Sequence, residues 1–277
     1  MLTVSTVSDL RRIRGSLHGT FGLVPTMGAL HLGHLSLVSR ARAECDHVGV
    51  SIFVNPTQFG PNEDLSRYPR DLERDLGLLR PLGVDVVWAP APAEVYPSGF
   101  QTRIAIEGVG APLEGVHRPG HFQGVATVVT KLFNVFAPAR AYFGQKDAQQ
   151  AAVIKRLARD LNFPVTIVVC PTVREPDGLA MSSRNSYLSA EERRAATVLY
   201  RALTAAKSRY DAGEHDAGVL RATMQSILAA EPLARVDYVS AASADALDEL
   251  DRVRAGALLS LAVRIGSVRL IDNLVLP

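Results

Sequence analysis

Two histidines three residues apart, His31 and His34, occupy a turn with the composition of a phosphate-binding site. The turn joins an apolar run that ends near Thr26 to a helical pattern that begins near His34, and it contains Gly28 and Gly33. A strand-to-helix junction offers unpaired backbone N–H groups and the positive end of a helix dipole to an anion. The imidazoles could donate hydrogen bonds to phosphoryl oxygens as charge develops on them. The segment predicts a nucleotide-phosphate site, with two packed turn histidines as the alternative.

Metal binding is a weaker interpretation of the acidic and histidine residues. Zinc needs a third and usually a fourth ligand, and neither a cysteine pair nor a glutamate at metalloprotease spacing lies near the histidines. The acidic stretch of Asp71, Glu73 and Asp75 could bind magnesium, but a solvated helix face is its ordinary explanation. We therefore assign no residue to a metal site.

A second strand-to-helix turn carries a lysine. Lys146 follows the apolar run of residues 141–143 and precedes a helical pattern from about residue 148 to residue 161. Its ammonium group can neutralise a phosphate, while Asp147 can either cap the helix or help to hold magnesium. A solvated lysine at a helix start is the alternative.

Two further segments combine polar side chains with turn residues. Asn55 and Gln58 follow the apolar run of residues 48–54, at the strand end where open α/β sheets bind ligands. Their amides suit the hydroxyl and carboxylate groups of a small polar substrate, although Asn-Pro is also a common turn element. The loop of residues 181–185 holds two hydroxyls and a guanidinium that could bind triphosphate oxygens, or it could be a structural serine-rich turn.

Together these segments resemble the pantothenate synthetase family. His31-Leu32-Gly33-His34 is similar to the HIGH-type motif of nucleotidyltransferases and class I aminoacyl-tRNA synthetases, and residues 25–30 before it are similar to the pantothenate synthetases specifically. Further matching segments follow in family order and spacing, so the resemblance covers nearly the whole chain. The sequence departs at Leu32, where the family often has an acidic residue, and Arg184 replaces a lysine of the synthetases' mobile KMSKS loop.

The resemblance implies an enzyme that condenses pantoate with β-alanine at the expense of ATP. The expected intermediate is a pantoyl adenylate, the expected products besides pantothenate are AMP and pyrophosphate, and Mg²⁺ is expected with the ATP. A homodimer is also implied. Two alternatives remain open: an adenylyl-transferring enzyme with another acid or phosphate ester, and a catalytically silent nucleotide- or RNA-binding module. The intact histidines and Lys146 argue against a silent module.

The resemblance also assigns roles to residues of this chain. The catalytic residues are expected to be His31, His34, Lys146 and Arg184. The residues expected to contact the nucleotide are Met27, Gly28, Ala29, Leu30, His31, Leu32, Gly33, His34, Gly144, Gln145, Lys146, Asp147, Val173, Met181, Ser182, Ser183 and Arg184. The residues expected to bind pantoate or β-alanine are Asn55, Gln58 and Gln150.

The elements that must position these residues alternate between strands and helices in the first half of the chain. Apolar runs alternate with helical patterns; the runs lie at residues 23–26, 48–54, 84–88, 141–143 and 165–169, and the patterns at 34–44, 71–82 and 148–161. This alternation predicts an α/β fold with a Rossmann-like, doubly wound parallel sheet.

After about Pro171 the pattern changes to that of a smaller α+β domain. Ser189 and Glu192 form a capping-box pattern before a helix that ends at Gly213, a second helix is predicted at 217–230, and strands are predicted at 236–239, 258–263 and 267–271. We place the domains at residues 1–172 and 173–277, with the second closing over the active site.

Composition limits the partners and the compartment. The 30 lysines and arginines nearly balance 28 acidic residues, and the basic groupings at 11–14 and 193–194 have the pattern of exposed helix faces, so nucleic acid is not an expected partner. No apolar run reaches the roughly 18 residues of a membrane helix, and no leader is recognised. Cys45 and Cys170 indicate buried free thiols, which predicts a cytoplasmic location.

Overall fold

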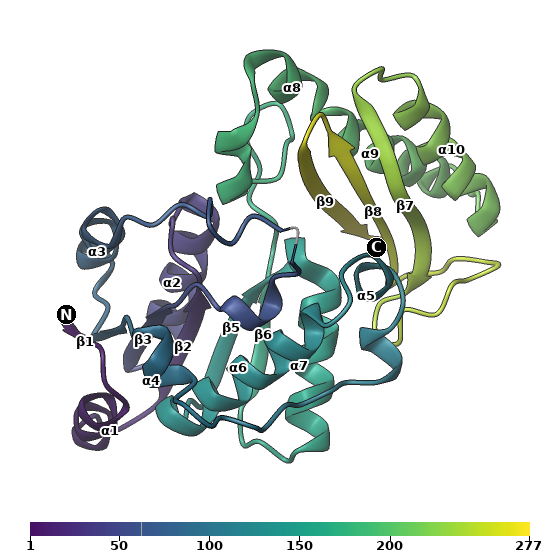
Figure 1. Ribbon diagram of the computed structural model, residues 1–277. Coiled ribbons are helices and arrows are strands. Elements are labelled where there is room, and N and C mark those ends of the chain that lie inside the picture. The colour runs from purple at the N-terminus through teal and green to yellow at the C-terminus, as the bar shows by residue number, and fades with distance from the viewer. Residues whose placement is uncertain (62) are drawn as a thin grey trace. The chain divides into compact units, whose positions relative to one another are not determined.

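The computed structural model describes residues 1–61 and 63–277, which form two compact units (Figure 1). The first unit contains residues 1–144 and 153–171, and the second contains residues 145–152 and 172–277. Helix α7 (Ala148–Asp160) is shared, because its first five residues belong to the second unit and the rest to the first. The short segment 145–152 is therefore part of the C-terminal unit, although the sequence places it well inside the N-terminal half.

A six-stranded parallel sheet forms the centre of the first unit. Its strands are β1 (Leu2–Val4), β2 (Phe21–Thr26), β3 (His47–Ile52), β4 (Val86–Trp88), β5 (Arg140–Gly144) and β6 (Thr166–Cys170). They are ordered β1-β4-β3-β2-β5-β6, and every pair is parallel. The chain runs outward from β2 through β3 and β4 and then returns to β5 on the other side, so the direction of winding reverses between β2 and β5. Ligands of open α/β sheets bind at the carboxyl edge at such a point.

Helices cover both faces of this sheet. Alternate strand residues divide between two cores, since Leu23 and Phe143 pack with helices α1 (Val7–Ser16), α6 (His121–Phe136) and the end of α7, whereas Val24 and Tyr142 pack with α2 (Leu32–Glu44) and α3 (Leu72–Leu79). Strands buried on both faces have continuous apolar runs, which is the pattern seen in the sequence. The predicted doubly wound α/β fold is confirmed.

Short helices complete the first unit. They are α4 (Pro92–Val95), α5 (Glu114–His117) and the 3₁₀ turns at Pro56–Gln58, Arg80–Leu82 and Gly108–Gly110. Among the described residues, no helix combines the length and the apolar character that a membrane crossing requires. Cys45 and Cys170 are buried free thiols, as predicted.

The second unit is a small α+β assembly, as predicted. Its elements are α8 (Ala190–Ala195), α9 (Val198–Asp211), α10 (Ala217–Ala229), β7 (Ala234–Ser243), β8 (Ala257–Ile265) and β9 (Val268–Val275). The strands form an antiparallel sheet in the order β7-β8-β9, and α9 and α10 pack on one of its faces (Figure 1). The capping box is present, since Ser189 Oγ accepts from Glu192 N at 3.2 Å and Glu192 Oε2 accepts from Ser189 N at 2.8 Å.

Two of the arginines expected on exposed helix faces are instead partly buried. Arg14 donates to the Phe136 carbonyl at 2.8 Å and lies 4.5 Å from the centre of the Phe21 ring. Arg193 forms an ion pair of 2.9 Å with Glu175. Both arginines therefore join elements of their own unit, a role that the local charge pattern does not reveal.

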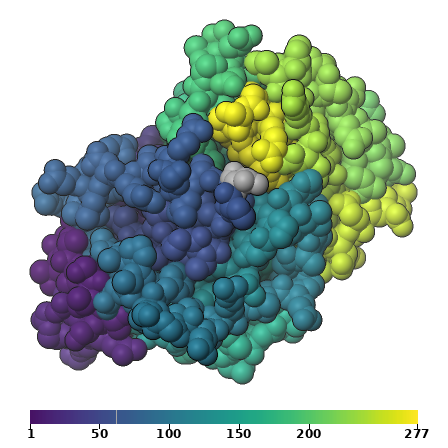
Figure 2. Space-filling model, in the orientation of Figure 1, coloured from purple at the N-terminus to yellow at the C-terminus, as the bar shows by residue number. Residues whose placement is uncertain are grey.

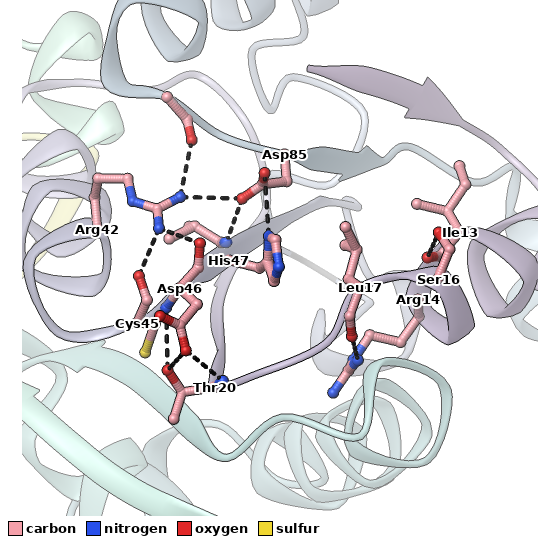
Figure 3. A network of polar contacts seen from close by, with 12 residues as sticks. Ile13, Arg14, Ser16, Leu17, Thr20, Arg42, Cys45, Asp46, His47 and Asp85 are labelled. Atoms are coloured by element: carbon pink, nitrogen blue, oxygen red, sulfur yellow. Dashed lines mark hydrogen bonds and ion pairs between the residues drawn. The ribbon is translucent and has the colours of Figure 1, made fainter.

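A polar network holds the amino edge of the large sheet (Figure 3). Asp85 Oδ2 accepts from Val48 N at 2.7 Å and from Arg42 Nη1 at 3.1 Å, and Asp85 Oδ1 lies 3.4 Å from His47 Nδ1. Beside it, Thr20 Oγ1 donates to Asp46 Oδ2 at 2.7 Å. Thr20, Asp46 and Asp85 directly precede β2, β3 and β4, so the network stabilises the edge opposite to the one at which ligands are expected.

Candidate active site

The structure brings the two histidines together at the carboxyl end of β2. His31 is the N-cap of α2, and its Nδ1 accepts from Gly33 N at 3.1 Å, while His34 Nδ1 accepts from His31 N at 3.4 Å. The ring centres are 4.1 Å apart. Because each Nδ1 is an acceptor, each neutral ring carries its proton on Nε2. Leu32, between them, is 61% exposed.

The backbone of this turn differs from the sequence-based expectation. The N–H groups of Gly28, Ala29 and Leu30 donate to Thr26 Oγ1, Asp75 Oδ2 and Asp75 Oδ1, at 3.2, 2.8 and 2.8 Å. The N–H groups of His31, Gly33 and His34 are also donated within the turn. The expected cradle of unpaired backbone donors is therefore wrong for these six residues, and the side chains of the histidines become the main donor candidates.

Asp75 is the residue that holds the turn, and the prediction that it lies on a solvated face is wrong. Asp71 and Glu73 are exposed as expected, but the side chain of Asp75 is only 1% exposed. Its two oxygens take one backbone N–H each, which favours the ionised form. Burial raises the pKa of this carboxyl, while the hydrogen bonds from Leu30 and Ala29 oppose that rise. Helical periodicity alone could not show which acidic residue faces the turn.

Glycine is required at position 28 for two reasons. Its φ is +80°, a conformation that other residues rarely adopt. A Cβ there would lie 3.0 Å from Asp75 Oδ2 and 3.1 Å from Ile52 Cγ2. The close approach of the backbone lets Asp75 reach the two following N–H groups.

We expect Asp75→Asn to loosen the histidine turn. One oxygen becomes an amide that must face a backbone N–H, which should lower the free energy of unfolding by about 2 kcal/mol. Because His31 follows this pair of N–H groups directly, any reaction that depends on the two histidines should slow about tenfold. Glu73→Gln is the matched control, since it removes the same charge from an exposed position of the same helix. Equal effects of the two substitutions in urea unfolding and in turnover would contradict a role for Asp75 in holding the turn.

Asn55 and Gln58 lie together in the turn after β3. Asn55 is 1% exposed, and its Nδ2 donates to Gln58 Oε1 at 3.0 Å and to the Gly124 carbonyl at 3.2 Å. Asn55 Oδ1 accepts from the Tyr96 hydroxyl at 2.8 Å and from Thr57 Oγ1 at 2.8 Å. The amide of Asn55 is therefore used within the protein, where it orients Gln58 so that the Nε2 end of Gln58 points away from Asn55.

Helix α6 packs against the turn that carries Gln58. A Cβ on Gly124 would lie 2.4 Å from the Thr57 carbonyl oxygen, so only glycine allows this approach. His121 Nδ1 donates to the Gln58 carbonyl at 2.9 Å, and Arg118, which forms a bidentate ion pair with Glu63, donates to His121 Nε2 at 3.1 Å. In Figure 2 the blue surface around residue 60 accordingly adjoins the teal surface around residue 120.

The buried His121 predicts a pH-dependent stability. Burial and the neighbouring Arg118 lower the pKa of His121 to about 4 from its usual 6.5. Between these values the unfolded chain binds a proton that the folded chain does not, so the free energy of unfolding falls as the pH drops from about 6.5 to about 4, by up to about 3 kcal/mol. In His121→Asn the amide can still donate to the Gln58 carbonyl but cannot titrate, so this variant should lose that part of the slope.

Urea unfolding across this pH range measures the effect. The matched control is His18→Asn, which makes the same substitution at an exposed histidine. A wild-type slope in His121→Asn would show that other groups cause the acid sensitivity.

The lysine turn lies in the second unit. Gly144 ends β5, which pairs in parallel with β2, and residues Gln145–Asp147 form a 3₁₀ turn before α7. Lys146 is partly exposed and Asp147 is exposed. Gln150 lies in the first turn of α7 and is partly exposed. The strand-to-turn-to-helix arrangement predicted around Lys146 is present.

The remaining nucleotide candidates lie in the second unit, in a small hairpin of residues 173–181 and at the start of the 3₁₀ turn Ser183–Tyr187 that follows it. Met181 N donates to the Val173 carbonyl at 3.0 Å, which places the two candidates side by side. Ser182 Oγ accepts from Arg184 N at 3.2 Å and caps the 3₁₀ turn Ser183–Tyr187. Residues 181–184 are all partly exposed, so they are accessible to a ligand.

Within residues 1–61 and 63–277, no three histidine, cysteine, aspartate or glutamate side chains are grouped so that they could hold a metal ion.

Three residues that support the site in the structure were given no role in it by the sequence analysis, namely Asp75, His121 and Asn273. Each is buried and contacts a predicted residue, yet none lies in a recognisable motif.

Comparison with known proteins decides the family. A family model described as pantoate-beta-alanine ligase matches residues 2–275 of the chain. The chain belongs to the pantoate-beta-alanine ligase family. The predicted enzyme class, a pantoate-beta-alanine ligase, is thereby confirmed.

Individual members of this ligase family are similar over their full lengths. A pantothenate synthetase of Roseiflexus castenholzii is 64% identical over 276 residues, which cover 100% of this chain and 99% of that protein. A crystal structure of pantothenate synthetase from Thermus thermophilus has a TM-score of 0.96 at 52% identity, with 100% of both chains covered. A ligase from Francisella tularensis, solved with beta-gamma ATP and beta-alanine, has a TM-score of 0.82 at 38% identity and covers 99% of this chain and 97% of that one.

Proposed function

We propose that the chain joins pantoate to β-alanine at the expense of ATP, through a pantoyl adenylate, and releases AMP and pyrophosphate. The observation that carries the proposal is the reciprocal cap of His31 and His34, which sets two Nε2–H groups at the carboxyl end of β2, beside the reversal of the sheet. The Francisella relative, solved with beta-gamma ATP and beta-alanine, supports the same ligands here.

In the first step a carboxylate oxygen of pantoate attacks the α-phosphorus of ATP. The bond from this phosphorus to the bridging oxygen of pyrophosphate breaks, and the electron pair leaves with pyrophosphate. Negative charge grows on oxygens that need donors or cations. We assign this role to His31, His34, Lys146 and Arg184. The mixed anhydride that forms has a far better leaving group than the original carboxylate.

In the second step the amine of β-alanine attacks the acyl carbon of the adenylate. The bond from this carbon to the phosphate oxygen breaks, AMP leaves with the electron pair, and the amine loses a proton as the amide forms. The protein's task in this step is to hold the two reactants in order and to exclude water from the anhydride.

We assign recognition of the acid to Gln58. Its Oε1 accepts from Asn55, so Nε2 is the end that would donate to a carboxylate or hydroxyl oxygen. Gln150 is proposed as a second contact with pantoate. Asn55, which was expected to bind the substrate, is proposed instead to be a positioning residue that orients Gln58.

Magnesium fits this chain as an ion carried by the nucleotide. Mg²⁺ bound to a triphosphate needs only one or two protein carboxylates and keeps several waters. Asp147, exposed next to Lys146, is the carboxylate that would hold it. When bound, the ion would neutralise charge on the pyrophosphate group.

The proposal includes the organisation of the protein. Residues 173–277 are proposed to close over the nucleotide as a domain distinct from residues 1–172. Two buried free thiols support a reducing compartment, hence the cytoplasm. The family resemblance supports a homodimer, which sedimentation equilibrium would detect as twice the chain mass.

Exchange of labelled pyrophosphate into ATP tests the proposed function. The exchange should require pantoate and should proceed without β-alanine, because only the first step is reversed. A second acid that supports exchange as well as pantoate, or exchange that depends on β-alanine, would overturn the proposed reaction.

A further inference from the structure

We propose that Asp272 and Asn273, neighbours on β9, are positioning residues that hold the nucleotide-binding segments of the second unit in one frame. Asn273 positions Lys146, and Asp272 positions the hairpin of residues 173–181 that leads to Ser182 and Arg184. The inference rests on the proposed function, since it assumes that these segments bind ATP.

Asn273 holds both peptide groups that flank Lys146. Its side chain is buried, at 3% exposure of the residue, and Nδ2 donates to the Gln145 carbonyl at 3.0 Å and to the Lys146 carbonyl at 2.9 Å. Asn273 Oδ1 accepts from Gln145 Nε2 at 2.9 Å. Fixing the carbonyls on either side of the Lys146 Cα fixes the φ and ψ of that residue, and hence the direction of its Cα–Cβ bond. The long lysine side chain therefore leaves the backbone in a set direction.

Asp272 holds the hairpin in a similar way. Its carboxylate accepts from Arg174 Nη1 at 2.6 Å and from Arg174 Nη2 at 2.9 Å, a bidentate pair. Arg174 also donates to the Gly178 carbonyl at 3.0 Å and lies 4.0 Å from the centre of the Tyr200 ring. Since Arg174 follows Val173, the ion pair fixes the base of the hairpin.

The two neighbours serve two segments because successive side chains of a strand point to opposite faces. Asn273 reaches the turn of residues 145–147, and Asp272 reaches the hairpin. Lys146 and the loop that contains Ser182, which under the proposed function act on one triphosphate, are thus held by adjacent residues of β9. Misplacement of a catalytic group by about 1 Å can lower the rate on the order of 10²-fold, so the loss of these positioning contacts should have a measurable effect on the rate.

The decisive variant is Asn273→Asp, which keeps the shape of the side chain and replaces both N–H donors with an oxygen that faces two carbonyls. We expect ATP affinity by calorimetry to fall about tenfold and the exchange rate to fall about 30-fold. In a Lys146→Ala background the same substitution should change both quantities less than about twofold, because the group that it positions is absent.

A merely structural role would reduce both quantities by the same factor in either background, and that result would overturn the proposal. Asn273→Ser provides the same test with a smaller, uncharged side chain if the aspartate variant does not fold, as judged by thermal unfolding. The corresponding test for the hairpin compares the effect of Asp272→Asn on ATP affinity and exchange in the wild-type background with its effect in an Arg184→Ala background.

The matched control is Ser240→Ala. Ser240 is buried in the same sheet, on β7, and its hydroxyl has no hydrogen-bond partner among the described residues. Its removal should leave ATP affinity and exchange unchanged, and a loss equal to that of Asn273→Asp would also overturn the proposal.

Calorimetry separates this inference from the proposed function. If the wild-type protein binds ATP and the variants show the expected coupling between Asn273 and Lys146, but pantoate-dependent exchange is absent, the proposed reaction is overturned and the positioning role of Asn273 is retained. If the wild-type protein exchanges pyrophosphate, but the effects of substitutions at Asn273 and Lys146 on ATP affinity and exchange are additive, the positioning role is overturned and the proposed reaction is retained. Failure to bind ATP at all would overturn both.

Discussion

Replacement of His34 with alanine is expected to lower the rate of pantoate-dependent pyrophosphate exchange by about 10²- to 10³-fold. The Nε2–H of His34 is proposed to donate to an oxygen on which charge grows only in the transition state, and loss of one such preorganised donor has an effect of this size. The substrate KM values should change much less than kcat, because the interaction is weak in the ground state. Near-normal exchange would remove His34 from the mechanism.

Alanine also removes the cap that His34 provides, so a matched pair of variants is needed. In His34→Gln the amide nitrogen can occupy the position of Nε2, and in His34→Asn the amide oxygen can occupy the position of Nδ1, which accepts from His31 N. If donation to the phosphate matters, the glutamine variant should keep more activity, while the asparagine variant should keep more of the roughly 1 kcal/mol that a helix cap contributes to stability. The reverse order of activities would assign His34 to the turn alone.

Replacement of Lys146 with alanine is the second change with a large expected effect. Removing the ammonium group should lower exchange by about 10²- to 10³-fold, since this group is proposed to stabilise the charge that develops on the leaving pyrophosphate. Lys146→Arg should recover only part of this loss, because the planar guanidinium donates with a different geometry. Steady-state kinetics with ATP as the varied substrate separate a change in kcat from one in KM.

The control for this variant is Lys155→Ala. Lys155 is exposed on the same helix, α7. Its removal changes the net charge by the same amount, so the long-range electrostatic effect on nucleotide binding is matched. A comparable loss in both variants would show that Lys146 acts through overall charge and not through contact with the phosphates.

Local features of the site could be predicted because they depend on residues close together in the chain. The turn from β2 into α2, the lysine turn after β5 and the capping box at Ser189 each lie within about ten residues, where turn chemistry and capping are short-range effects. The doubly wound parallel sheet was predicted from the alternation of apolar runs and helical patterns, whereas the order of its strands, strand β1 and helices α1 and α6 were not predicted. The family resemblance then assigned roles that no periodicity could supply.

Helix α6 shows where local reasoning fails. It is 16 residues long and is largely buried. Its interior contains Val125, Val128 and Val129, which in isolation favour strands because their χ1 angles are restricted in a helix. Packing against α1 and the sheet overrides that preference, and α6 is the element that supports the Gln58 turn.

The sequence by itself determined which reactive groups are present and their local structural setting. These groups are a histidine pair and a lysine, each at a strand-to-helix turn, and a hydroxyl-rich loop beside a hairpin. Only the tertiary structure decided that Asp75, and not the neighbouring Glu73, turns inward to bind the histidine loop, and that Asn273 holds a turn 127 positions away. The physical reason is that hydrogen bonds between distant segments depend on which faces pack together, and that choice is made by the whole core and not by any short stretch of chain.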